Sequence, residues 1–219
     1  MIEIVDCQQG AEAWYRARMG IPTASMFATV MASGRDGGAS KTRRSYMLQL
    51  AGEILTGQPA ETFSNHHMER GKSMEDEARD LYAFTHDVEP QRVGFIRNGP
   101  VGCSPDSLIG AIGMLEVKSA LPAILLDKLL RDAFPPEHKA QCQGGLWVAE
   151  REWVDIAVYC PGLPLFAKRG WRDDAYIKTI STAVDEFLAE LRETVEHVRR
   201  YRPAPVSKPA ERLSILAAG

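Results

Sequence analysis

The spacing of apolar and charged residues in the first half of the chain is typical of amphipathic helices. It predicts helices over residues 8–19, 23–32, 41–56 and 68–85. Thr23 begins the second segment, where its hydroxyl is suited to cap the helix. Gly57 follows the third segment and predicts its end, because glycine readily takes the left-handed backbone found at helix C-termini. The glycine-rich residues 33–38 predict a flexible loop.

After His86 the chain changes to short apolar segments separated by Gly and Pro, a pattern typical of strands. Three of these segments predict the strands of an antiparallel meander, namely 92–96, 106–109 and 114–118. Two helices are predicted next, over 123–131 and 137–149. Two further strands follow, over 153–159 and 165–169.

A long amphipathic helix is predicted over residues 174–201. Its apolar residues recur every three or four positions and form one stripe, made of Tyr176, Ile180, Val184, Phe187, Leu191 and Val195. We expect this stripe to pack across the sheet, with an oligomer interface as the alternative. The order of elements, with helices before and between the strands and one helix after them, predicts an α+β (or α/β) fold with a mixed central sheet.

The composition is that of an ordinary globular protein, with 219 residues of which 45% are hydrophobic and 25% charged. This length predicts a single domain over 1–201, followed by a loosely ordered tail over 202–219 that contains several prolines. No apolar run approaches the roughly 18–20 residues that a membrane span needs, and the first residues include acids where a signal peptide would be basic. We therefore expect a cytoplasmic protein without membrane contact.

Cysteine and histidine spacing argues against two kinds of site. The four cysteines form no Cys-x-x-Cys pair and the five histidines no His-Glu-x-x-His motif, so neither disulfides nor a zinc site is expected. The net charge of −3 argues weakly against a protein coated in basic surface, but it leaves room for a local basic channel.

Three charged residues on the predicted strands form the strongest candidate site. Glu116 and Lys118 are two apart in one strand and therefore point to the same face. A hairpin through residues 110–113 would bring Asp106 beside Glu116. Two converging carboxylates repel each other unless a cation lies between them, and oxygen ligands of this kind suit Mg²⁺ or Mn²⁺. A lysine beside such an ion is suited to orient the attacking water and help deprotonate it.

An acid, a spacer and then Glu-x-Lys is the pattern of PD-(D/E)XK nucleases, although such a triplet alone is better explained by a solvated strand edge. The surrounding sequence adds weight. Five segments resemble, in order, motifs of the phage lambda exonuclease (YqaJ-like viral recombinase) family, namely 14–25, 71–79, 102–108, 115–118 and 141–143. The departures are Ser107 in place of the usual Gly, and Ser119 and Ala120 in place of Cys and Pro. None of them removes a metal ligand.

The resemblance implies a restriction-endonuclease-like core and a role for each matching residue. Asp106 and Glu116, with the Val117 carbonyl, would bind one Mg²⁺, and Glu75 would supply a carboxylate to a second ion; Mn²⁺ would substitute. Lys118 would act on the attacking water, and Gln141 would help position Lys118 or the scissile phosphate.

Two further groups are implied to bind DNA. A pocket for a terminal 5′-phosphate would consist of Arg18, Ser25 and Ser104, since a guanidinium forks onto phosphate oxygens and hydroxyls donate the remaining bonds. The second group lies on a basic loop and the start of the following helix and would contact the phosphates of the duplex; it consists of Arg35, Lys41, Arg43 and Arg44. A solvated charged surface explains the same residues almost as well.

The resemblance implies a phage- or prophage-encoded exonuclease, active in the cytoplasm of the bacterial host. It would degrade linear double-stranded DNA from 5′ to 3′ and leave 3′ overhangs. A homotrimeric ring around the DNA and a single-strand annealing recombinase as partner are also implied. Two alternatives stay open: a structure-selective endonuclease with the same metal site, and a catalytically silent DNA-binding protein.

Overall fold

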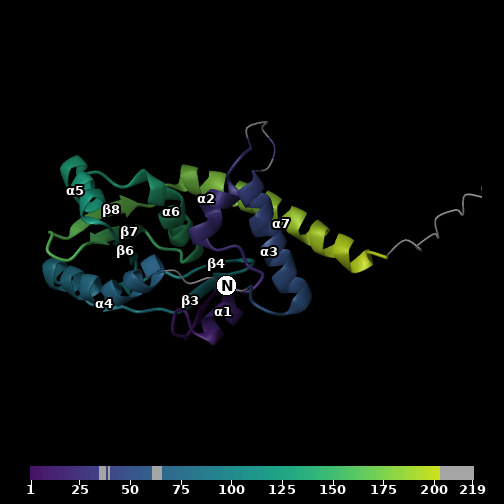
Figure 1. The fold of residues 1–219 in the computed structure, drawn as a ribbon, viewed down its shortest axis with the longest axis horizontal. Helices are drawn as coiled ribbons and strands as arrows, with labels where there is room; N and C mark the ends of the chain where they lie inside the picture. The colour runs from purple at the N-terminus through teal and green to yellow at the C-terminus, as the bar shows by residue number, and fades with distance from the viewer. Residues whose placement is uncertain (35–37, 39, 61–65, 203–219) are drawn as a thin grey trace, which may run out of the picture.

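The computed structural model describes residues 1–34, 38, 40–60 and 66–202, without the side chains of 66–73 (Figure 1). Within these residues, helices and two β-sheets alternate along the chain, which confirms the predicted α+β class. The predicted tail over 202–219 and part of the predicted loop, 35–37, fall largely outside the described residues. No helix in the described part is long and apolar enough to cross a membrane.

The larger sheet has the strand order β2-β5-β6-β7-β8, formed by Pro90–Gln91, Ser107–Ile109, Gly113–Ser119, Trp153–Tyr159 and Phe166–Trp171. Strands β5 and β6 form an antiparallel hairpin, β6 and β7 run parallel, and β7 and β8 run antiparallel. The predicted mixed sheet is therefore confirmed. The parallel pair is joined through α5 (Pro122–Arg131), η2 (Pro136–His138) and α6 (Lys139–Val148).

The smaller sheet corrects the predicted meander. Its order is β1-β3-β4, formed by Ile2–Val5, Phe95–Asn98 and Val101–Cys103. The segment predicted as the first meander strand falls partly on β3, which pairs with β1 near the N-terminus and not with the strand that follows Asp106. Neither β1 nor β4 was predicted. Local pattern cannot reveal a pairing whose two strands lie about ninety residues apart in sequence.

The helices before the large sheet follow the prediction most closely at α3 (Lys41–Thr56). Ser40 caps its first turn by accepting a hydrogen bond from the Arg43 backbone N–H, and Gly57 ends it with φ of 67°. The first predicted helix is shorter, and the second divides into a 3₁₀ turn and a short helix. The first predicted helix corresponds to α1 (Glu12–Arg18), and the second to η1 (Ala24–Met26) and α2 (Phe27–Val30). The fourth corresponds to α4 (His66–His86). Thr23 precedes η1, but its side chain makes no capping bond.

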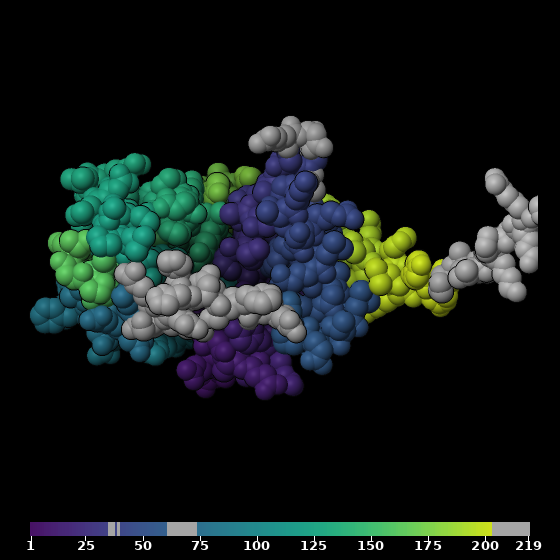
Figure 2. Space-filling view, viewed as in Figure 1, coloured from purple at the N-terminus to yellow at the C-terminus, as the bar shows by residue number. Residues whose placement is uncertain are grey.

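The apolar stripe of α7 (Asp174–Arg200) packs against α2, α3 and α6. Its main contacts are thus with helices, which corrects the prediction that it packs across the sheet. Glu190 of α7 also accepts two hydrogen bonds from Arg43 of α3, at 2.7 and 2.8 Å. In Figure 2 the end of α7 (yellow) projects beyond α3 (blue).

The central strands lie between helices on both faces (Figure 1). On one face, Ala78 and Tyr82 of α4 pack with Leu115 and Val117 of β6. The Tyr82 hydroxyl donates to buried Asp155 of β7 at 2.5 Å, which fixes α4 to the sheet. On the other face, α5 packs against β8 and α6 against β7. These contacts hold α4 and α6 on opposite faces of the sheet, on either side of the β5–β6 hairpin, where the candidate site lies.

Candidate active site

Asp106 and Glu116 lie side by side on the β5–β6 hairpin, as the hairpin argument expects. Ser107 pairs with Leu115, so the two acids occupy the next position of the same register. The Val117 backbone N–H donates to Asp106 Oδ2 at 2.6 Å. Burial and the negative charge of Glu116 together raise the pKa of Asp106 well above its ordinary value. The hairpin therefore brings together two carboxylates that repel each other.

Lys118 and Gln141 both bind the Glu116 carboxylate. The Lys118 ammonium lies 2.6 Å from Glu116 Oε1, and the Gln141 side chain, which comes from α6, donates to the same oxygen. Burial lowers the pKa of Lys118, but the charges of Glu116 and Asp106 outweigh burial and raise it. Lys118 is therefore a cation at neutral pH.

The oxygens that remain fit a divalent cation. Among the described residues, Asp106 Oδ1 and Glu116 Oε2 accept no protein hydrogen bond, and neither is sealed from solvent. Hard anionic oxygens in this arrangement suit Mg²⁺ or Mn²⁺. The Val117 side chain packs under α4, so Val117 has only its backbone to offer. No group of three His, Cys, Asp or Glu side chains in the described part is arranged to hold a metal by itself.

Glu75 lies on α4, beside this pair. Its negative charge contributes to the raised pKa of Asp106. Its own carboxylate accepts a hydrogen bond from Arg79, one turn further along the helix. Glu75 and Asp106 both line a groove of about 570 Å³. Glu75 is thus near the pair without joining it as a third direct ligand.

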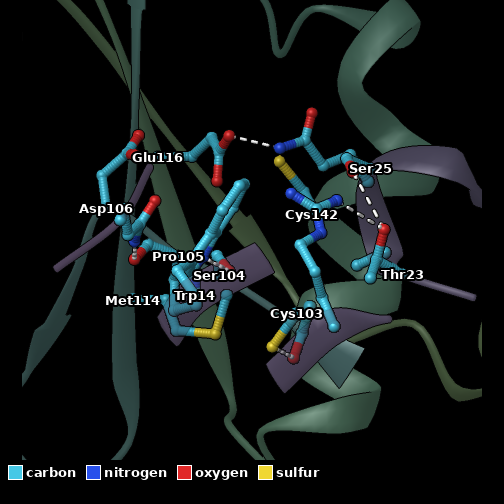
Figure 3. A pocket seen from close by; sticks show the side chains of 15 residues that line it. Trp14, Thr23, Ser25, Cys103, Ser104, Pro105, Asp106, Met114, Glu116 and Cys142 are labelled. Atoms are coloured by element: carbon cyan, nitrogen blue, oxygen red, sulfur yellow. Dashed lines mark hydrogen bonds between the residues drawn. The ribbon is translucent and has the colours of Figure 1, made fainter. Parts of the chain in front are cut away.

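The three residues predicted to bind a 5′-phosphate line one cavity of about 200 Å³, together with Asp106, Glu116 and Gln141. Figure 3 shows Asp106 and Glu116 at one side of this cavity and Ser25 at the other. Arg18, Ser25 and Ser104 come from α1, η1 and the segment after β4. The cavity therefore holds both predicted constellations at once.

Trp14 and Thr23 organise this cavity. The Trp14 indole N–H donates to Ser104 Oγ at 2.8 Å, and the Arg18 guanidinium lies 4.1 Å from the centre of the Trp14 ring. Thr23 Oγ1 accepts from Arg18 at 3.2 Å and lies 3.3 Å from Ser25 Oγ. Burial lowers the pKa of Arg18, and Arg18 forms no ion pair within the described residues. A partly desolvated guanidinium without a carboxylate partner is suited to bind an anion.

Sequence reasoning missed Trp14 and Thr23. It assigned Trp14 no role of its own, although Trp14 lies four positions before Arg18, which sets both residues on one helix face. It read Thr23 as a cap, although the hydroxyl faces the cavity instead. Arg79 was noted only as part of a motif, and its spacing from Glu75 was the available signal.

The basic residues predicted to contact DNA separate into different environments. Lys41 and Arg44 are exposed at the start of α3, while Arg35 lies outside the described residues. Arg43 is a correction. It is buried, its guanidinium is paired with both oxygens of Glu190, and its Nε donates to the Val30 carbonyl at 3.1 Å. All three of its guanidinium nitrogens therefore donate inside the protein, which favours a structural role over contact with DNA.

Residues 13–152 match the family model of the YqaJ-like viral recombinase domain. Among solved structures, the chain is similar to an alkaline exonuclease (LHK-Exo) from Laribacter hongkongensis, with 32% identity, a TM-score of 0.78, and 87% of this chain and 97% of that chain covered. The complex of LHK-Exo with dAMP gives 34% identity and a TM-score of 0.79 with the same coverage.

A phage-related exonuclease from Haemophilus somnus 129PT shares the fold, with a TM-score of 0.63 at 13% identity over 81% of this chain and 96% of that chain. Comparison with curated protein sequences gives no match. The family model covers more than half of the chain, and the similarity to LHK-Exo extends over most of both chains. The chain therefore belongs to the YqaJ-like viral recombinase family of nucleases.

Proposed function

We propose that this protein is an exonuclease that degrades linear double-stranded DNA from 5′ to 3′ and leaves 3′ overhangs for phage-type recombination by strand annealing. The observation that supports this most strongly is the single cavity lined by both the carboxylate pair and Arg18, Ser25 and Ser104. A nuclease that cuts within a strand has no need for a pocket that binds a terminal phosphate.

The cofactor in this proposal is Mg²⁺, two ions per site, with Mn²⁺ as a substitute. Asp106, Glu116 and the Val117 carbonyl would hold one ion, and Glu75 would contribute a carboxylate to the other. When bound, such ions act as Lewis acids on the phosphate and lower the pKa of water. Their charge would also offset the repulsion between Asp106 and Glu116 and the repulsion between these acids and DNA.

Lys118 and Gln141 would orient the reacting groups. Because Lys118 is a cation held on Glu116, it would donate a hydrogen bond to the attacking water or to a phosphate oxygen. Gln141 binds the same carboxylate from α6 and would keep it in one rotamer while Lys118 donates.

The end of the duplex would be recognised on the other side of the cavity. The Arg18 guanidinium would fork onto two oxygens of the 5′-phosphate, and Ser25 and Ser104 would donate their hydroxyls. Trp14 holds Ser104 and covers Arg18, so it would keep the pocket in one arrangement. A strand bound by its terminal phosphate would then extend its next phosphodiester toward Asp106 and Glu116.

The proposal is tested by incubating the protein with linear and covalently closed circular duplex DNA, in Mg²⁺ or in EDTA. We expect mononucleotides from linear DNA in Mg²⁺ only, and an intact circle in every condition. Cleavage of the closed circle would support the structure-selective endonuclease instead. No cleavage of any substrate in Mg²⁺ would support a catalytically silent DNA-binding protein.

We further propose one nuclease domain over 1–201, a homotrimeric ring around the duplex, a single-strand annealing recombinase as partner, and a place of action in the cytoplasm of a bacterial host. These proposals rest on the family resemblance. Lys41 and Arg44 are exposed and would contact DNA phosphates. A ring would retain DNA by topology in spite of the net charge of −3. Light scattering should give about three times 24.2 kDa.

A further inference from the structure

We propose that Arg79 is a positioning residue of this site, which links Glu75 on α4 to the backbone of Asp106 before β5. The inference rests on the proposed function, because it concerns how the carboxylates are held ready for a divalent ion. Arg79 touches neither Asp106 nor Glu116 by a hydrogen bond, and it acts through its neighbours.

All three nitrogens of the Arg79 guanidinium donate to polar partners. Nε donates to Ser107 Oγ at 3.0 Å, Nη1 donates to Asp76 Oδ1 at 2.7 Å, and Nη2 donates to Glu75 Oε1. The side chain is only 5% exposed. A buried guanidinium with three partners is confined to one position, and the groups that it binds are confined with it.

Ser107 carries this constraint to Asp106. Its side chain is fully buried, and its hydroxyl donates to the Asp106 carbonyl at 2.6 Å while it accepts from Arg79. A hydroxyl has one proton, and that proton is used on Asp106, so the bond from Arg79 must enter through a lone pair. An unbroken chain of hydrogen bonds therefore runs from α4 to the residue that carries the central carboxylate.

The positive charge of Arg79 also acts on Glu75. Glu75 is about one-third exposed, and like charge opposes its approach to the carboxylates of Asp106 and Glu116, so a cation bound to Glu75 helps to keep it beside them. Arg79 holds Glu75 Oε1 and leaves Oε2 without a protein partner in the described part of the chain. That free oxygen is the one available to a divalent ion.

Arg92 supplies a matched control. It binds the same oxygen of Asp76 as Arg79 does, but it is 64% exposed and makes no hydrogen bond to Glu75 or Ser107. Replacing Arg92 thus removes a positive charge from the same neighbourhood and leaves the chain from Glu75 to Asp106 intact.

The test is a calorimetric titration of the full chain with Mn²⁺ in the absence of DNA, for the wild type and for Ser107→Ala, Arg79→Lys and Arg92→Gln. Groups that hydrogen-bond metal ligands typically contribute 10–100-fold to metal affinity. We expect Ser107→Ala and Arg79→Lys to weaken Mn²⁺ binding by about that factor, and Arg92→Gln to leave it within about twofold of wild type. Ser107→Ala removes only a hydroxyl, so it carries the test if Arg79→Lys is too unstable to titrate.

Thermal unfolding of each variant separates positioning from support of the fold. If Ser107→Ala and Arg79→Lys melt at lower temperature but bind Mn²⁺ as the wild type does, Arg79 is structural and the proposal is overturned. If the wild type itself binds no Mn²⁺, the proposed metal site fails, which is a separate result from equal binding by wild type and variants.

Discussion

Removing the Arg18 guanidinium should slow digestion of 5′-phosphorylated DNA far more than digestion of 5′-hydroxyl DNA. Only one of its five N–H donors has a partner among the described residues, the Thr23 hydroxyl at 3.2 Å. The remaining donors are free for a phosphate in the cavity that Arg18 shares with Asp106 and Glu116. Arg18→Ala therefore removes the only positively charged side chain that lines this cavity in the described structure.

The size of the effect follows from the kind of contact. A terminal phosphate carries roughly one more negative charge than an internal diester. A hydrogen bond between charged groups contributes roughly 1.5–3 kcal/mol, and about 1.4 kcal/mol corresponds to a tenfold change. The wild type should thus digest phosphorylated ends about 10- to 100-fold faster than hydroxyl ends. Arg18→Ala should lose most of this preference, with the hydroxyl substrate nearly unaffected.

The assay measures initial rates on two duplexes that differ only in the 5′ group, at substrate concentrations below saturation. Arg16→Ala is the matched control, because Arg16 lies on the same helix but is 69% exposed and paired with Glu12. It should leave both rates unchanged. If Arg18→Ala slows both substrates by the same factor, Arg18 contributes general DNA affinity. If the wild type does not distinguish the two ends, the end pocket is refuted.

Four further substitutions test the other parts of the site and fold. Asp106→Ala or Glu116→Ala should abolish cleavage, because each removes a proposed metal ligand. The melting temperature should stay nearly unchanged, because relief of carboxylate repulsion offsets the lost contacts. Wild-type rates in product-release assays would falsify the metal-site assignment. Lys118→Ala should lower kcat while calorimetric Mn²⁺ affinity survives, and equal loss of both would make Lys118 a structural residue. Arg43 lowers the pKa of Glu190, so their pair stabilises the fold above the ordinary glutamate pKa and loses this effect as pH falls through the lower folded value. Glu190→Gln should therefore reduce the free energy of unfolding, measured in urea titrations, by about 1 kcal/mol at neutral pH. The difference between wild type and variant should shrink below about pH 4. A difference that does not change with pH would argue against the ion pair.

Sequence patterns predicted the elements whose signals are local. Helix α3 has a capping serine before it and a left-handed glycine after it, and β7 is apolar at every position except Asp155, so both have the predicted bounds. Strand β1 could not be predicted in this way, because it is only partly buried and its partner β3 lies far along the chain. The first strand of the predicted antiparallel meander was wrong for the same reason, while its other two strands pair as predicted.

In the candidate site, too, local patterns predicted some residues, while others depend on contacts between distant parts of the chain. The two-residue period of a strand was enough to bring Glu116 and Lys118 to one face, and one hairpin was enough to add Asp106. The burial of Arg43 depends on Glu190, 147 residues away, and no local pattern reports such a pairing. The bond between Trp14 and Ser104, 90 residues apart, likewise emerges only when the chain is folded.

In the proposed function, one cavity binds the 5′ end and hydrolyses the strand that carries it. The most direct measurement uses a linear duplex with a single accessible 5′-phosphate, its two strands labelled differently, digested in Mg²⁺. We expect mononucleotides from the phosphorylated strand only, with the complementary strand surviving at full length. Internal fragments of both strands, or digestion of the complementary strand from its 3′ end, would contradict it.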